Sequence, residues 1–142
     1  MNALVNVYLR EGQVIVAPCA GGGGVTYEIE PVLLAPPVSD DVRTAVTESL
    51  EVSERHMPAP LPNLRGYRSP VLAKLRLRSL RQFYQNVALC AVYRNDSGVA
   101  IQAYEPARDG KGFQPTGDPL MVPEPARLCE LILQTLETSP RL

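Results

Sequence analysis

The stretch LVNVYLREGQVIVAP, residues 4–18, predicts that the fold is built around an antiparallel β-hairpin. Its first half alternates strictly between two sets of side chains, Leu4, Asn6 and Tyr8 against Val5, Val7 and Leu9. Such a two-residue period is typical of a strand with two different faces. Glu11-Gly12 interrupts the pattern, and residues 13–18 resume it with β-branched side chains. We therefore expect one strand on each side of this turn.

The next segments, moving outward from the hairpin, are a run of glycines and a further β-like stretch. Gly-rich turns can hold phosphate where they open onto a helix, but residues 21–24 lead into Val25-Thr26-Tyr27-Glu28, which is a strand pattern. We therefore interpret the glycines as a connection between strands. Residues 25–34 are predicted to form a third strand, with Glu28 and Glu30 on its solvent-facing side.

A long amphipathic helix is expected from Ser39 to about Arg55. The Ser39 hydroxyl suits a helix cap, and Asp40 and Asp41 suit the positive end of the helix dipole. Pro58 ends the helix before Met57. One side of the helix is buried in this prediction, comprising Val42, Val46, Ser49, Leu50 and Ser53. The opposite side is largely acidic and comprises Asp41, Thr44, Glu48, Glu51 and Arg55.

The rest of the chain alternates between short helices and hairpins. Residues 58–62 favour a polyproline conformation and residues 69–74 a helix. Residues 75–78 alternate as in a strand, whereas the spacing of apolar residues over 77–84 favours a second short helix, which we prefer. Residues 86–94 and 99–105 are strands joined by the turn 95–98, and a short strand (120–122) precedes a closing helix (125–137). The sequence predicts a single α+β domain over residues 1–142, mainly an antiparallel sheet of hairpins with about three helices packed on it.

Composition excludes several functional classes. The three cysteines form no CxxC pair and only one histidine is present, so we expect no metal site and no cofactor. Cys90 and Cys129 lie in apolar patterns and are expected to be buried reduced thiols, which favours a cytoplasmic protein. No apolar run reaches the ~18 residues of a membrane span, and no secretion signal is evident.

The sequence offers few groups for catalysis. His56 is the only side chain that titrates naturally near neutral pH, and no serine or cysteine lies in a recognisable nucleophile motif beside it. Asp40 and Asp41 are explained by their place in the first turn of a helix. We therefore expect a protein that is not an enzyme; an enzyme using His56 or a cysteine is the least favoured alternative.

Charge is sharply segregated along the chain. Residues 57–95 carry seven basic and no acidic side chains, a balance of +7, whereas residues 1–56 and 96–142 have balances of −5 and −3. Such a basic segment would suit nucleic acid, with Phe83 or Tyr84 stacking on bases. The sequence pI of 5.8 argues against direct nucleic-acid binding. Internal ion pairs with the acidic flanks and a surface for a protein partner remain as alternatives.

The order of the segments resembles the immunity proteins of contact-dependent growth inhibition systems, the CdiI type. The resemblance covers most of the chain and rests on residues 4–8 with 12–16, 27–31, 69–72 leading to 79–84, 112–113, and 122–123 before the closing helix. It implies a non-catalytic protein that binds and neutralises the toxic C-terminal domain of a cognate effector, commonly a nuclease. Its partner would then be that toxin domain.

A nuclease is expected to be basic where it holds nucleic acid, so an inhibitor of it should present carboxylates. We therefore predict toxin-binding roles for Glu28, Glu30, Asp41, Glu48 and Glu51. The alternative function is a small RNA- or DNA-binding module that uses the basic segment 65–81.

Overall fold

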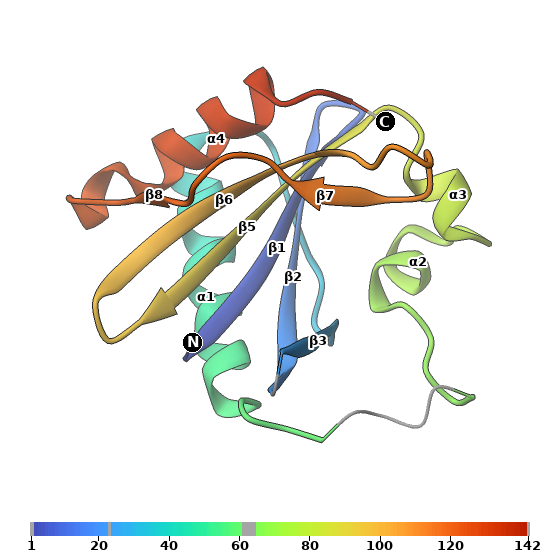
Figure 1. Ribbon diagram of the computed structural model, residues 1–142, viewed down its shortest axis with the longest axis horizontal. Helices are drawn as coiled ribbons and strands as arrows, with labels where there is room; N and C mark the ends of the chain where they lie inside the picture. Colours follow the sequence, from blue (N-terminus) through green and yellow to red (C-terminus); the bar gives the residue numbers. More distant parts are fainter. Residues whose placement is uncertain (1, 23, 61–64, 142) are drawn as a thin grey trace.

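The predicted hairpin lies at the centre of a curled antiparallel sheet (Figure 1). The computed structural model describes residues 2–22, 24–60 and 65–141. In these residues β1 (Ala3–Arg10) pairs with β2 (Gln13–Gly22) on one side and with β5 (Val87–Asn95) on the other, and β5 pairs with β6 (Gly98–Pro106). Both predicted hairpins are confirmed, as is the α+β class.

Each outer strand of this four-strand centre pairs with two short strands in succession. Strands β3 (Val25–Glu28) and β4 (Leu33–Ala35) both pair with β2, and β7 (Phe113–Pro115) and β8 (Leu120–Met121) both pair with β6. The prediction of one continuous strand over residues 25–34 is therefore wrong. Pro31 lies in the interruption, and since it has no amide hydrogen it cannot continue a ladder of hydrogen bonds.

The glycine run includes the end of β2 as well as the turn that leads into β3. Gly21 and Gly22 are the last residues of β2, and Gly21 has a φ of +128°, a conformation that L side chains rarely adopt. A Cβ atom on Gly21 would lie 2.3 Å from the carbonyl oxygen of Val25. A glycine is therefore required where β2 turns back into β3.

One face of the sheet is covered by α1 (Ser39–Arg55) and α4 (Leu128–Thr138), which follows a 3-10 turn over Pro125–Arg127 (Figure 1). The predicted bounds of the first helix are confirmed, and all five residues of its apolar side are buried. The predicted Ser39 cap is wrong, because Val38 occupies the N-cap position and no side chain caps the helix. No helix in the described residues is long and apolar enough to cross a membrane.

The second face of the sheet is covered at one end only. There α2 (Pro70–Leu75) and α3 (Leu80–Phe83) bury Val71 and Phe83 against β1, β2 and β5. The hydroxyls of Ser69 and Ser79 accept hydrogen bonds from the backbone amides of Leu72 and Gln82, which fixes the start of each helix. The preference for a helix over a strand near residue 80 is confirmed.

Helix α1 is fastened to the sheet by a buried serine where β1 and β2 separate. The Ser53 hydroxyl accepts a hydrogen bond from the amide of Leu4 (2.8 Å) and donates one to the carbonyl oxygen of Cys19 (2.6 Å). Leu4 and Cys19 lie one position beyond the Val5 and Pro18 pair that ends the β1–β2 ladder. The hydroxyl therefore bridges two backbone groups at the point where the ladder stops.

Candidate binding site on the open face of the sheet

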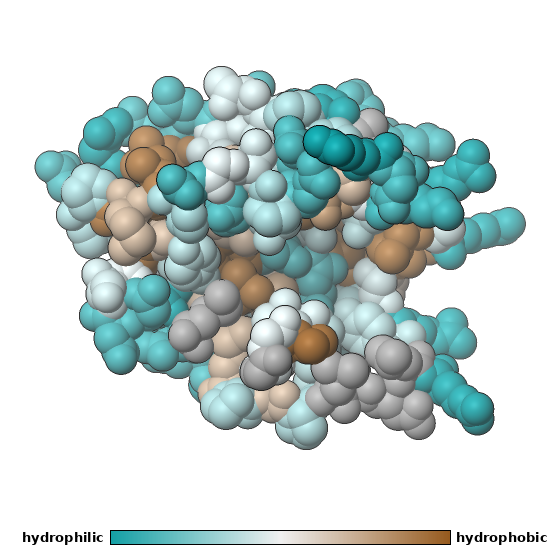
Figure 2. Space-filling view, in the orientation of Figure 1, coloured by the Kyte–Doolittle hydropathy of each residue, from teal (hydrophilic) through white to brown (hydrophobic). Residues whose placement is uncertain are grey.

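The uncovered end of the second face forms a broad hollow of about 1080 Å³, which we call the sheet groove. Its lining includes Leu4, Ala91, Tyr93 and Tyr104 from the central strands and Met57 and Pro58 from the segment after α1. Figure 2 shows this face hollowed between β7 and β3, with both apolar and hydrophilic surface in the hollow and hydrophilic side chains around it. A mixed apolar and polar surface of this kind is typical of protein-binding surfaces.

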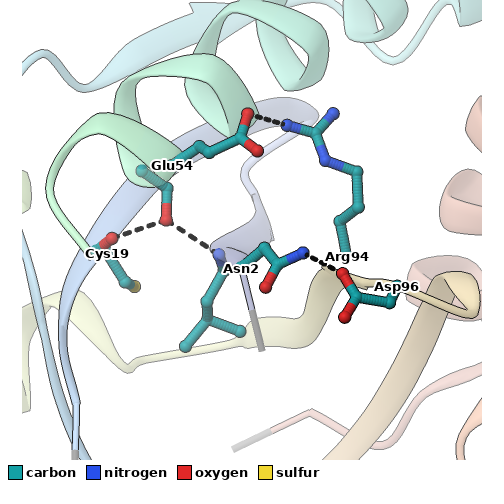
Figure 3. Close-up of polar contacts among 7 residues, drawn as sticks. Asn2, Cys19, Glu54, Arg94 and Asp96 are labelled. Atoms are coloured by element: carbon teal, nitrogen blue, oxygen red, sulfur yellow. Dashed lines mark hydrogen bonds and ion pairs between the residues drawn. The ribbon is translucent and has the colours of Figure 1, made fainter. Parts of the chain in front are cut away.

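Polar contacts hold the edge of the sheet groove together (Figure 3). The guanidinium of Arg94 forms an ion pair with the carboxylate of Glu54 at 2.8 Å, joining β5 to the end of α1. The side-chain amide of Asn2 donates a hydrogen bond to Asp96 at 3.0 Å, joining the start of β1 to the β5–β6 turn. These contacts tie the elements that border the groove to one another.

A smaller hollow of about 360 Å³ adjoins the sheet groove, and Thr26 lines both. We call it the tyrosine pocket, because Tyr8, Tyr27, Tyr67 and Tyr84 line it together with Glu28. Glu28 is the last residue of β3 and pairs with Cys19 of β2. Cys19 packs with Leu4 and Ala91 on the open face, so this register directs Glu28 onto the same face.

The Glu28 carboxylate is partly buried and hydrogen bonded through one of its oxygens. Oε2 accepts hydrogen bonds from the Tyr8 hydroxyl at 2.6 Å and from the Asn6 side-chain amide at 2.9 Å. Burial raises the pKa of Glu28 above its ordinary value of 4.5, and these two bonds, which favour the charged form, only partly offset the burial. The pocket therefore holds a carboxylate in surroundings that disfavour its charge.

The same surroundings raise the pKa values of tyrosines in the pocket. Burial, and then the nearby Glu28 carboxylate, raise the pKa of Tyr67 to about 12 and also raise the pKa values of Tyr8 and Tyr84. The Tyr67 hydroxyl donates to the backbone carbonyl of Glu28 at 2.8 Å, and its ring meets that of Tyr27 edge to face, with centroids 6.0 Å apart. Tyr67 thus fastens the segment before α2 onto β3.

The five predicted toxin-binding carboxylates do not form one surface. Asp41, Glu48 and Glu51 are exposed on α1, as predicted, on the sheet face opposite the tyrosine pocket. Glu30 is exposed in the bend after β3. The prediction that Glu28 lies on a solvent-facing side of its strand is wrong, because β3 ends with that side chain turned toward Asn6 and Tyr8.

Four cations of the basic segment are exposed and, within the described residues, are not neutralised by the acidic flanks. Lys74, Arg76, Arg78 and Arg81 are exposed around α2 and α3. Ion pairs among the described residues include Arg10–Glu11, Arg94–Glu54 and Arg127–Glu130, and none of these four cations takes part in them. Internal ion pairing with the acidic flanks was one interpretation of the basic segment. Of Arg94 and the four exposed cations, only Arg94 forms such a pair within the described residues.

The groups considered for catalysis or metal binding lie apart from the two hollows, except for Cys19. His56 is exposed, with Nδ1 2.9 Å from the backbone carbonyl oxygen of Val52. Cys19, Cys90 and Cys129 are buried free thiols, as predicted for the last two, and burial raises the pKa of Cys90 to about 12. Within the described ranges, no three His, Cys, Asp or Glu side chains are placed to share a metal ion.

Comparison with solved structures identifies the fold. A chain of the CdiA-CT/CdiI toxin and immunity complex from Yersinia pseudotuberculosis superposes with a TM-score of 0.66 at 14% identity, covering 96% of this chain and 95% of that one. The protein of unknown function NMB0488 from Neisseria meningitidis superposes with a TM-score of 0.65 at 11% identity, covering 94% and 92%. No protein-family model and no curated protein match the sequence. At these identities the likeness shows a shared fold.

Proposed function

We propose that this chain is an immunity protein of a contact-dependent growth inhibition system, which binds the toxic C-terminal domain of its cognate effector and neutralises it. The observation that carries the proposal is the fold: 96% of the chain superposes on a chain of a toxin and immunity complex. The order of sequence segments resembles the same family. The sheet groove and the tyrosine pocket add an open face on which a protein partner can be held.

In this proposal the chain acts in the cytoplasm by binding alone, and the toxin is a nuclease with a basic surface. The exposed carboxylates of Asp41, Glu48 and Glu51 then attract the toxin before contact, because opposite charges accelerate encounter at low ionic strength. Specificity for one toxin comes from the groove and pocket, whose shape and polar groups must match the partner.

Co-expression with a toxin domain encoded beside this chain tests the proposal. Cells that produce the toxin domain should stop growing, and cells that also produce this chain should grow normally. A toxin domain from an unrelated system is the control, and this chain should give no rescue from it. Failure to rescue growth by a chain that is soluble and folded in those cells would contradict the proposal.

One observation favours a second function, the binding of nucleic acid through the basic segment. Lys74, Arg76, Arg78 and Arg81 are exposed and, within the described residues, form no ion pair. A nucleic-acid-binding protein would bind RNA or heparin at physiological salt, with an affinity that falls steeply as salt is added. We expect no such binding to RNA or heparin from an immunity protein with a sequence pI of 5.8.

A further inference from the structure

Among the described residues, the Glu28 carboxylate forms hydrogen bonds through only one of its two oxygens. Oε2 accepts two hydrogen bonds, one from the Tyr8 hydroxyl and one from the Asn6 side-chain amide. Within the described residues, the fully buried side-chain nitrogen and oxygen atoms without a hydrogen-bond partner are Arg10 Nε and Ser49 Oγ. Glu28 Oε1 is not one of them, so it is not a fully buried acceptor left without a partner. Oε1 is therefore the acceptor that the tyrosine pocket offers to an incoming group.

None of the described residues that line the pocket carries a positive charge to balance this carboxylate. Glu28 takes part in none of the ion pairs of the described residues, and the groups that bear on its ionisation are a hydroxyl and an amide. A carboxylate withdrawn from water is costly without a cationic partner. A cation supplied by another molecule would offset this unfavourable free energy of burial.

The walls of the pocket suit a cation carried on an apolar stem. Four tyrosines line it, and the faces of aromatic rings attract ammonium and guanidinium groups. Val25 and Leu80, which also line it, are 48% and 46% exposed and offer apolar surface to the methylene groups of a long side chain. The volume of about 360 Å³ is near the lower end of the ~300–1,000 Å³ range of small-ligand sites.

We propose that the tyrosine pocket receives the side chain of one lysine or arginine of the toxin domain, whose charged group binds Glu28 Oε1 and whose stem packs on Val25 and Leu80. The identity of the partner rests on the proposed function. A protein segment crossing the sheet groove can reach the pocket, because the two hollows meet at Thr26. A basic toxin surface supplies the cation, and Glu28 thereby becomes a determinant of specificity.

The pocket is tested first without any toxin. Butylammonium and butylguanidinium chlorides are titrated into the purified chain, and the tyrosine ring signals are followed by NMR. Both cations, or the one that matches the toxin residue, should shift the Tyr67 and Tyr84 rings with a dissociation constant on the order of 10 mM. Glu28→Gln should abolish the shifts, and butanol should not cause them. Equal shifts in wild type and Glu28→Gln, or none in wild type, would overturn the inference.

Glu30→Gln is the matched control, because Glu30 is exposed two residues away and lies outside the pocket lining. Its response to both cations should equal that of the wild type. Thermal unfolding of both variants checks folding. We expect Glu28→Gln to be no less stable than wild type at neutral pH, because it removes a charge that burial disfavours.

The toxin domain then tests the partner. Glu28→Gln should weaken toxin binding by about 30-fold or more, mainly through faster dissociation. The control for this measurement is Glu137→Gln, at an exposed position of α4 outside the pocket lining, which should stay within about twofold of wild type. Equal toxin affinity of Glu28→Gln and wild type would overturn the inference and leave the immunity function standing. Cation binding without any toxin binding by the wild type would instead refute the proposed function and leave the pocket as a cation site.

Discussion

Two buried serines on α1 provide a sharp test of how the helix is fixed to the sheet. Ser49 and Ser53 are one helical turn apart and are 1% and 0% exposed. Ser53 bridges the Leu4 amide and the Cys19 carbonyl, whereas Ser49 Oγ has no partner within the described residues. The same substitution, serine to alanine, should therefore have opposite effects at the two positions.

The expected magnitudes follow from the bonds that are lost. Ser53→Ala leaves a buried amide and a buried carbonyl unsatisfied, which should reduce the free energy of unfolding by about 2–4 kcal/mol. The midpoint of thermal unfolding should fall by roughly 6–12 °C in a domain of this size. Ser49→Ala removes an unpaired buried hydroxyl and improves helix propensity, so it should leave stability unchanged or raise it by up to ~1 kcal/mol.

Urea unfolding followed by far-ultraviolet circular dichroism measures both effects on the same scale, with wild type beside the two variants. The difference between the variants should be at least about 2 kcal/mol. Equal losses in the two variants would show that the Ser53 bridge does not fasten α1 to β1 and β2.

Three further predictions concern Glu28, the β2–β3 turn and the acidic side of α1. Because burial places the pKa of Glu28 above its unfolded value of 4.5, ionising it destabilises the fold, and stability is lost as pH rises from 4.5 through the raised pKa. Urea unfolding should show Glu28→Gln more stable than wild type near pH 7, by about 1.4 kcal/mol for each unit of pKa elevation, with the gap closing toward pH 4.5; a gap independent of pH would contradict this. Gly21→Ala should lose about 2 kcal/mol or more in urea unfolding, since its Cβ would meet the Val25 carbonyl, whereas Gly24→Ala has free space and should lose less; equal losses would count against the tight turn. Charge reversal at Glu48 and Glu51 should slow toxin association in stopped-flow measurements at low salt with little change in dissociation, and unchanged association would refute a steering role for α1.

Local pattern was enough to predict the main elements. Strict alternation from Leu4 to Leu9 identifies β1, and the apolar stripe that includes Val42, Val46 and Leu50 identifies α1 with its observed bounds. The two hairpins follow from turn residues such as Gly12 and Gly98. These features depend on residues close together in sequence, so a single sequence reveals them.

The tyrosine pocket depends on contacts between distant segments, and the sequence carries no local signal for it. Tyr8, Tyr67 and Tyr84 come from β1, the segment before α2 and the end of α3, and they meet only because α2 and α3 fold back over the sheet. The direction of Glu28 depends on its pairing with Cys19, and a shift of one residue in that register would turn the side chain to the other face. Alternation within β3 alone could not decide this.

The division of the predicted carboxylates has the same origin. Asp41, Glu48 and Glu51 are spaced on one helix, so their shared exposure on α1 follows from helical periodicity. Which sheet face α1 covers is set by packing of its apolar side against β1 and β2, far along the chain. The sequence therefore predicted an acidic helix surface correctly and could not predict its separation from Glu28.

The central claim is that this chain binds and neutralises one toxin domain, and titration calorimetry with the two purified proteins tests it most directly. The account predicts a one-to-one complex with a dissociation constant of about 10 nM or tighter, as expected for a specific interface of ordinary size. The absence of binding heat at several temperatures, with both proteins folded and the toxin domain active, would contradict the account.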